Sequence, residues 1–138
     1  MSPIPHATIT TYLKTDYWVF GVHPFVLRIK QASEPLVKLY QQHRTDCAAF
    51  ITACNPFSSK LDDAANAARQ AELVKELTQR SLNFIEGEGR HPSDDWTEPS
   101  FLVLGLSLDE AKDLGVRFEQ NALVWCGADA TPELVLLR

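Results

Sequence analysis

The feature of this sequence that most limits how it can fold is a short apolar run from Cys47 to Ala53. Nearly every side chain in the run is apolar, so neither face of the segment is suited to water. This pattern is typical of a strand whose two faces are both covered. We therefore predict a central strand here, in a sheet that carries packed helices.

Helix start signals recur along the chain. Ser33-Glu34-Pro35 predicts a helix whose N-cap is Ser33. Ser107-Leu108-Asp109-Glu110 has the form of a capping box, and Ser59-Lys60-Leu61-Asp62 is close to one. The signal at Ser59 predicts the longest helix, which continues to about Arg80. A further helix is expected over residues 7–14.

Other strands are predicted where aromatic and β-branched residues gather, over residues 17–29, 82–86, 100–105, 122–126 and 134–137. The last two are expected to form a hairpin. Residues 87–99 have no regular periodicity and predict a long loop. The order of elements indicates an α+β (α/β-like) fold: a single globular domain over residues 1–138, with a single mixed sheet of about five to six strands and three to four packed helices.

Composition and charge exclude several classes of function. The formal net charge is −5, and residues 91–138 hold most of the acidic excess. Binding to nucleic acid is therefore unlikely, because phosphate neutralisation needs a basic surface. The first residues lack the pattern of a secretory signal, and no apolar stretch approaches the ~20 residues of a membrane span. We expect a cytoplasmic protein with no membrane association.

The cysteine and histidine residues do not predict a metal or cofactor site. Cys47, Cys54 and Cys126 are odd in number, lack CxxC spacing and lie in apolar segments, which favours reduced thiols in a cytoplasm. The four histidines show no ligand spacing for zinc. No glycine-rich phosphate-binding motif or catalytic elbow occurs. The sequence predicts no metal and no cofactor.

A polar cluster follows the central strand. The strand gives way to Asn55-Pro56-Phe57-Ser58-Ser59, and the helical pattern after it places Asn66 and Arg69 on the same face as Leu73 and Leu77. One interpretation is a site for a small polar or anionic ligand, bound by Asn55, Ser58, Ser59, Asn66 and Arg69. The alternative is an internal network in which Arg69 pairs with Glu98 or Glu119.

Two further groups could contribute to such a site. Trp96 and Glu98 stand two residues apart before an apolar strand, so both side chains would point the same way. An indole beside a carboxylate suits recognition of a base, a sugar or a cation, and a desolvated Glu98 could act as a general acid or base. Glu119 and Gln120 could reach the same pocket, or lie in a solvated turn.

These residues together suggest a family. The run Ile51-Thr52-Ala53-Cys54-Asn55-Pro56-Phe57-Ser58, then Asn66 and Arg69, Trp96-Thr97-Glu98-Pro99-Ser100-Phe101 and Phe118-Glu119-Gln120-Asn121-Ala122, resembles the bacterial family called domain of unknown function 3293. Cys54 stands where an aromatic residue is expected. The resemblance implies a small, cytosolic bacterial protein, and it implies no activity, cofactor or partner.

Two functions remain open from the sequence. The first is a site, binding or enzymatic, for a polar, nucleotide-like metabolite, with Glu98 or Glu119 as the candidate acid or base and Arg69 as the charge stabiliser. The second is a protein-interaction module without catalytic activity, in which the acidic C-terminal half docks a basic protein partner and the polar cluster only shapes the turn. A homo-oligomer is a further option.

Overall fold

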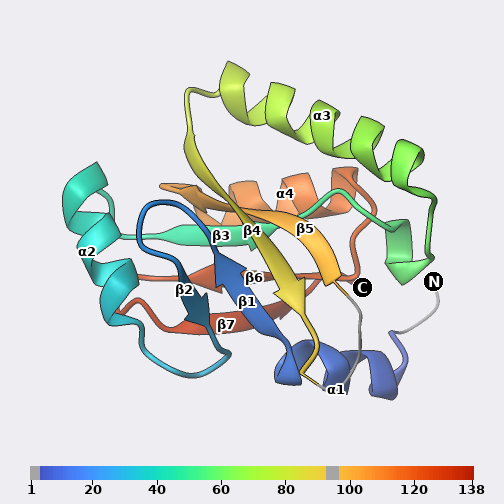
Figure 1. The fold of residues 1–138 in the computed structure, drawn as a ribbon, viewed down its shortest axis with the longest axis horizontal. Coiled ribbons are helices and arrows are strands. Elements are labelled where there is room, and N and C mark those ends of the chain that lie inside the picture. Colours follow the sequence, from blue (N-terminus) through green and yellow to red (C-terminus); the bar gives the residue numbers. More distant parts are fainter. Residues whose placement is uncertain (1–3, 93–96) are drawn as a thin grey trace.

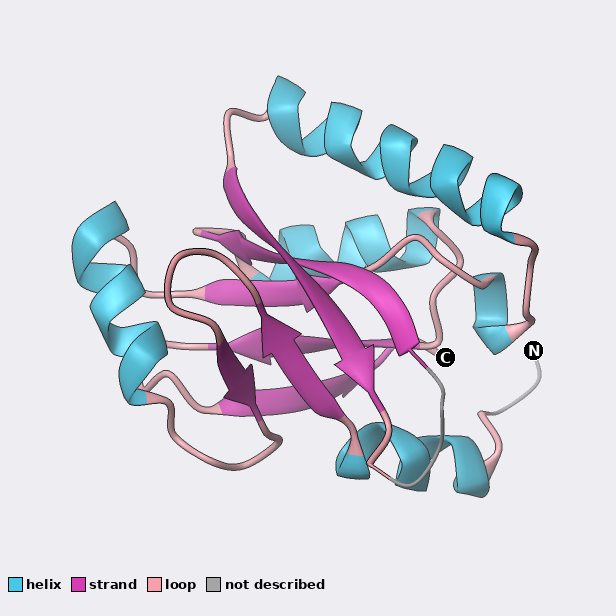
Figure 2. Ribbon diagram, in the orientation of Figure 1, coloured by secondary structure: helices cyan, strands magenta, loops and turns pink. Residues whose placement is uncertain are grey.

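The computed structural model describes residues 4–92 and 97–138 of the chain. Within these residues it contains four α-helices, a short 3-10 helix and a seven-stranded sheet, drawn in Figures 1 and 2. The helices are α1 (His6–Lys14), α2 (Glu34–His43), α3 (Asp63–Gln79) and α4 (Leu108–Arg117), with the 3-10 helix η1 at Pro56–Ser58. The strands are β1 (Asp16–Val19), β2 (Phe25–Leu27), β3 (Ala48–Ile51), β4 (Asn83–Arg90), β5 (Thr97–Leu104), β6 (Ala122–Cys126) and β7 (Pro132–Leu136).

The expected α+β architecture is confirmed, but the expected number and mixed direction of the strands are wrong. The order in the sheet is β2-β1-β4-β5-β3-β6-β7, and every neighbouring pair is antiparallel. Residues 17–29, where Gly21 and Pro24 are expected to break or bulge the strand, form two strands, because the chain turns between them at Gly21, which has a φ of 92°. This hairpin raises the strand count to seven.

The helical connections explain why the sheet is wholly antiparallel. A helix between two strands usually joins parallel neighbours, which led to the expectation of a mixed sheet. Here α3 joins β3 to β4, which lie on either side of β5, and α4 joins β5 to β6, which lie on either side of β3. The joined strands run in the same direction, but an antiparallel strand separates each pair.

Within the predicted loop over residues 87–99, residues 87–90 and 97–99 belong to strands. β4 continues to Arg90 and β5 begins at Thr97, and the two pair along their whole length. Gly87 is required here because a Cβ atom at this position would lie 2.2 Å from the carbonyl oxygen of Trp18 on β1. Gly87, part of the segment predicted to be a loop, thus allows a close approach between β4 and β1.

Helix capping largely follows the sequence. Ser33 accepts a hydrogen bond from the backbone N–H of Leu36, and Ser107 and Glu110 form the predicted capping box. In α3, however, the N-cap is Asp62, which accepts from the N–H of Ala65, and not Ser59. Ser59 has an extended backbone, with φ −88° and ψ 116°, so the helix begins later than predicted.

Both faces of the sheet are covered, as the apolar run predicts. Leu36 and Tyr40 of α2 pack on one face, together with Phe50 and Leu102 of the sheet. Side chains of α3 and α4 pack on the other. Figure 1 shows α3 along the top of the view, above the strands. β3 lies inside the sheet between β5 and β6, which confirms it as a central strand. Among the described residues, no helix combines the length and apolar character needed to cross a membrane.

Candidate functional site

The early end of β3 creates an opening in the sheet. β3 stops at Ile51, while its neighbour β5 extends four residues further, from Ser100 back to Thr97, with only β4 as a strand partner there. The carbonyl oxygen of Pro99 points toward the opening and accepts hydrogen bonds from the side chains of Thr52 (2.7 Å) and Gln70 (3.1 Å). Proline suits this position because its missing N–H would face the same opening.

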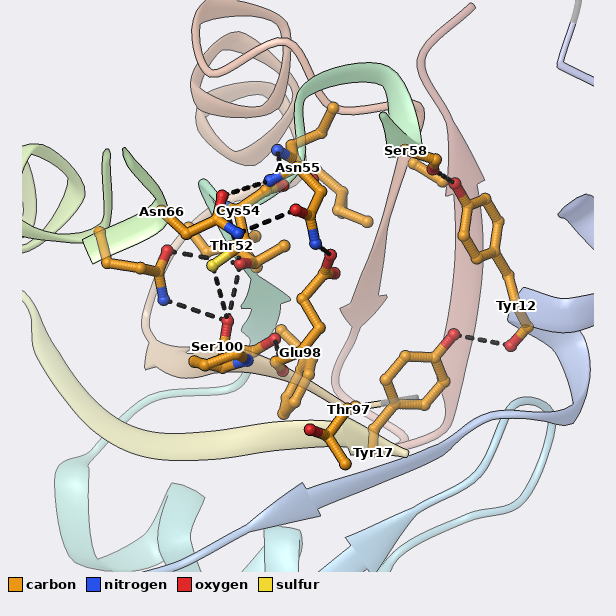
Figure 3. A pocket seen from close by; sticks show the side chains of 18 of the residues that line it. Tyr12, Tyr17, Thr52, Cys54, Asn55, Ser58, Asn66, Thr97, Glu98 and Ser100 are labelled. Atoms are coloured by element: carbon orange, nitrogen blue, oxygen red, sulfur yellow. Dashed lines mark hydrogen bonds between the residues drawn. The ribbon is translucent and has the colours of Figure 1, made fainter. Parts of the chain in front are cut away.

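A cavity of about 880 Å³ occupies this region (Figure 3). It is lined on one side by the turn after β3 and the start of α3, and on the other by β5, β6 and Tyr12 of α1. Its walls combine apolar and aromatic side chains, such as Phe50 and Tyr17, with polar ones that include Asn55, Ser58, Glu98 and Gln120. A concave site of this size, in which polar side chains converge among apolar and aromatic ones, is a candidate site for a small molecule.

Glu98 supplies a carboxyl group to the cavity. It lies opposite Gly89 in the β4–β5 pair, and its Oε2 accepts a hydrogen bond of 2.9 Å from Nδ2 of Asn55. Figure 3 shows its side chain directed toward Asn55. Desolvation by burial raises the pKa of Glu98 to about 7, although the hydrogen bond from Asn55 acts in the opposite direction. The group therefore titrates near neutral pH.

The orientation of the Asn55 amide is determined by its other partners. Its Oδ1 accepts from the backbone N–H of Leu61 (3.0 Å) and from Nδ2 of Asn66 (2.8 Å). Oδ1 of Asn66 in turn accepts from the backbone N–H of Asn55 (2.9 Å). Because a backbone N–H can only donate, Oδ1 must face Leu61 and Nδ2 must face Glu98. Asn66 thus positions Asn55, and Asn55 positions the carboxyl group.

A second polar group lies on the α1 side of the cavity. The hydroxyls of Tyr12 and Ser58 are 2.5 Å apart, and Nδ2 of the buried Asn121 donates to both oxygens. Nη1 of Arg138 donates to Oδ1 of Asn121 at 2.8 Å, which orients this amide. The network joins α1 and Arg138 to the turn after β3.

The turn after β3 has an unusual backbone. Asn55, Phe57 and Ser58 have φ values of 50°, 51° and 61°, in the left-handed region, and Glu119, whose carbonyl accepts from the N–H of Phe57, has a φ of 59°. Asparagine adopts this conformation readily, but a bulky residue such as phenylalanine does so at a cost. Such strained residues cluster at functional sites in proteins.

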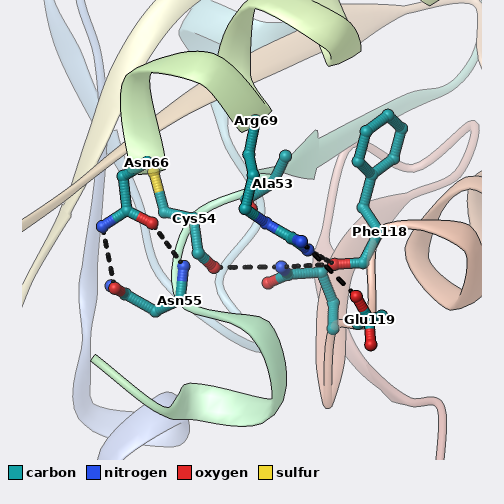
Figure 4. Close-up of polar contacts among 8 residues, drawn as sticks. Ala53, Cys54, Asn55, Asn66, Arg69, Phe118 and Glu119 are labelled. Atoms are coloured by element: carbon teal, nitrogen blue, oxygen red, sulfur yellow. Dashed lines mark hydrogen bonds and ion pairs between the residues drawn. The ribbon is translucent and has the colours of Figure 1, made fainter. Parts of the chain in front are cut away.

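Arg69 is held by the protein itself (Figure 4). Its Nε donates to the carbonyl of Ala53 at 2.6 Å and its Nη2 to the carbonyl of Phe118 at 2.5 Å, and Nη1 lies 3.4 Å from Oε1 of Glu119. Arg69 is not among the described residues that line the cavity. Its guanidinium group joins the turn after β3 to the segment between α4 and β6.

Replacing Arg69 with alanine is expected to lower the free energy of unfolding by about 2–3 kcal/mol, because two backbone carbonyls lose a charged donor. Urea unfolding of the variant measures this loss. Ligand affinity of the folded variant is expected to match that of the wild type. Unchanged stability together with lost binding would instead make Arg69 a ligand-binding group.

The structure brings together five of the residues proposed from the sequence and separates the others. Those that line the cavity are Asn55, Ser58, Asn66, Glu98 and Gln120. Ser59, Arg69 and Glu119 are not among its described lining residues, and Trp96 lies outside the described residues. Sequence reasoning missed Tyr12 and Tyr17, which no local motif distinguishes from ordinary aromatic residues.

The described residues include no group of histidine, cysteine and acidic side chains arranged to hold a metal ion. Cys54 and Cys126 are buried, Cys47 is half-buried, and all three are free thiols. Burial raises the pKa of each of these thiols. A thiol with a raised pKa is a weak nucleophile at neutral pH, so none of the three cysteines is a candidate nucleophile.

The comparisons with known proteins give a family but no activity. No curated protein and no solved structure matches this chain. One family model, described as a protein of unknown function (DUF3293), matches residues 51–123, from the end of β3 through α3, β4, β5 and α4 to the start of β6. This match covers more than half of the 138 residues and includes Asn55, Asn66 and Glu98, so the chain belongs to the DUF3293 family.

Proposed function

We propose that this protein binds a small polar molecule in the cavity beside β3, with Glu98 as the main polar contact. The observation that carries the proposal is the position of the Glu98 carboxyl group, which lies desolvated in a cavity of about 880 Å³. Leaving a carboxyl group in such surroundings costs free energy. A ligand that hydrogen-bonds to it would recover part of that cost.

The hydrogen bonds around Glu98 support this role. Its Oε2 accepts from Asn55, whereas Oε1 accepts no hydrogen bond from any residue that the structure describes. The side chain is held from one side by the Asn66–Asn55 pair, so its free oxygen has a defined direction. A preorganised acceptor of this kind loses little conformational entropy when a ligand binds.

The geometry favours a polar ligand over an anionic one. The donors of Arg69 are directed at Ala53, Phe118 and Glu119, and Lys60 is the one basic side chain among the described lining residues, at an exposed position. A nucleotide-like ligand would therefore be recognised through its base rather than through its phosphate.

A thermal-shift screen tests the proposal. Nucleosides, amines, amino acids, sugars and organic acids would be added to the wild type and to Glu98→Ala, with Glu133→Gln as a control at an exposed carboxylate that pairs with Lys30. A ligand at about 100 times its Kd is expected to stabilise the wild type by about 2.7 kcal/mol, and so to raise Tm by several degrees. Glu98→Ala is expected to lose the shift, and the control to keep it.

A screen without any stabilising compound would contradict the proposal and favour the interaction module instead. Hits that bind Glu98→Ala as well as the wild type would place the site elsewhere. A pKa near neutral pH also suits proton transfer, so Glu98 is the residue at which turnover of a confirmed ligand would be tested. Glu119 is half-exposed beside Arg69, outside the described lining of the cavity.

A further inference from the structure

We infer that the ligand of this cavity is a small organic cation, an amine, amidine or guanidine, whose N–H groups donate to Oε1 of Glu98. This inference rests on the function proposed above and names the chemical class of the ligand. It also depends on which hydrogen-bond donors and acceptors of the lining side chains are not already used within the protein.

Several polar side chains of the cavity have already used all their donors within the protein. The hydroxyl of Tyr17 donates to the carbonyl of Tyr12 at 2.6 Å, and that of Thr52 donates to the carbonyl of Pro99 at 2.7 Å. Neither hydroxyl has a second proton to give a ligand. Near Glu98, these two hydroxyl groups can therefore accept a hydrogen bond from a ligand but cannot donate one.

The amide groups are used in the same way. Nε2 of Gln120 donates to the carbonyls of Cys54 (3.0 Å) and Phe118 (3.1 Å), and Nδ2 of Asn66 donates to Oδ1 of Asn55. A ligand with acceptors at this end would find few partners. A ligand with N–H donors would find the free oxygen of Glu98.

Charge and aromatic groups point to the same class. The acidic residues Glu98 and Asp63 line the cavity against one basic residue, Lys60, as far as the structure describes its walls. The rings of Tyr17 and Phe50 meet edge to face, with centroids 5.3 Å apart, and both contribute to the wall. A cation is attracted both by a carboxylate and by aromatic faces, and both attractions strengthen where water is excluded.

The opposite side of the cavity provides one donor. Tyr12 and Ser58 share a single hydrogen bond, and both oxygens accept from Asn121, so one of their two hydroxyl protons is not used by any described residue. A ligand with a nitrogen donor at one end and an oxygen acceptor at the other would match both sides. The hydroxyl pair thus adds specificity to the recognition of charge by Glu98.

Three probes of nearly identical shape separate the classes: benzamidine is a cation, benzamide is neutral and benzoate is an anion. Titration calorimetry at about pH 8, where Glu98 is mostly ionised, would compare them. Benzamidine is expected to bind at least about tenfold more tightly than benzamide, since a charge-assisted hydrogen bond is roughly twice as strong as a neutral one. Benzoate is expected to bind most weakly.

The role of Glu98 has its own controls. Glu98→Gln keeps the shape of the side chain and is expected to lower the affinity for benzamidine by about tenfold or more. Glu133→Gln is expected to leave this affinity unchanged. In the wild type, lowering the pH from about 8 to about 6 is expected to lower the affinity for benzamidine by about tenfold, because Glu98 becomes protonated. The glutamine variant should show little of this pH dependence.

Other outcomes would overturn the inference. If benzoate or benzamide binds as tightly as benzamidine, or if Glu98→Gln binds benzamidine like the wild type, the ligand is not a cation recognised by Glu98. If none of the three probes binds but the screen yields a neutral or anionic ligand that depends on Glu98, the class is wrong and the proposed function stands. If the screen also yields nothing, the proposed function fails as well.

Discussion

Glu98→Gln is expected to make the protein more stable than the wild type at pH 8, by about 3 kcal/mol, and equally stable near pH 4. The pKa of Glu98 in the folded state is about 7, against an ordinary value of 4.5 in an unfolded chain. At a pH between these two pKa values, Glu98 keeps its proton in the folded protein but has released it in the unfolded chain. Each unit of difference corresponds to about 1.4 kcal/mol, so the total is on the order of 3 kcal/mol.

The sign of the effect follows from the raised pKa. Below about pH 4.5 the carboxyl group is neutral in both states and imposes no penalty. As the pH rises toward 7, the unfolded chain ionises first and is favoured, so the wild type loses stability. Above pH 7 the loss is complete. Glutamine does not ionise, and its side-chain oxygen can still accept from Asn55.

Urea unfolding of both proteins at intervals from about pH 4 to pH 8 measures this difference. Glu133→Gln is the matched control: it removes an exposed carboxylate whose pair with Lys30 is expected to contribute at most about 1 kcal/mol. A glutamine variant less stable than the wild type at pH 8 would show that the Glu98 carboxylate is stabilised by its surroundings. If Glu98→Gln gains stability and loses ligand binding, it shows the trade-off between stability and activity that is common at functional sites.

Gly87→Ala is expected to lower the free energy of unfolding by about 3 kcal/mol, at the upper end of the range for overpacked positions. The new Cβ atom would lie 2.2 Å from the carbonyl oxygen of Trp18 and 3.0 Å from the ring of Phe50. The first contact is with backbone, which cannot move unless β1 separates from β4. A domain of this size would lose roughly 10 °C in Tm.

Thermal and urea unfolding of Gly87→Ala measure the loss, with Gly127→Ala as the matched control. At Gly127 a Cβ atom would lie 3.2 Å from the ring of Trp125, a side chain that can shift by a few tenths of an ångström. The control is therefore expected to lose about 1 kcal/mol or less. Equal losses in the two variants would contradict the close approach of β1 and β4 as the reason for the glycine.

Some features of the site could be predicted from the sequence because they depend on local periodicity. The pattern that places Asn66, Arg69, Leu73 and Leu77 on one helical face is confirmed: Leu73 and Leu77 are buried, and the two polar side chains reach the turn after β3. The helix repeat alone determines which residues share a face. It does not determine whether the guanidinium group meets a ligand or a backbone carbonyl.

Other features arise only when distant segments meet. Tyr12 and Ser58 are separated by 46 positions, and Asn55 and Glu98 by 43, so no local pattern could pair them. The cavity exists because β3 is shorter than β5, and the length of each strand is set by its partners across the sheet. The sequence could identify candidate residues here, but not their distances.

The sequence by itself determined the central strand, the caps of α2 and α4 and the final hairpin, because apolar runs, N-cap residues and turn residues act over a few positions. Only the tertiary structure decided that β4 and β5 pair through the glycine-rich segment, that Arg69 is used internally and that Glu98 titrates near pH 7. These three depend on strand pairing, on long-range hydrogen bonds and on desolvation. Each of them is a property of groups brought together by folding.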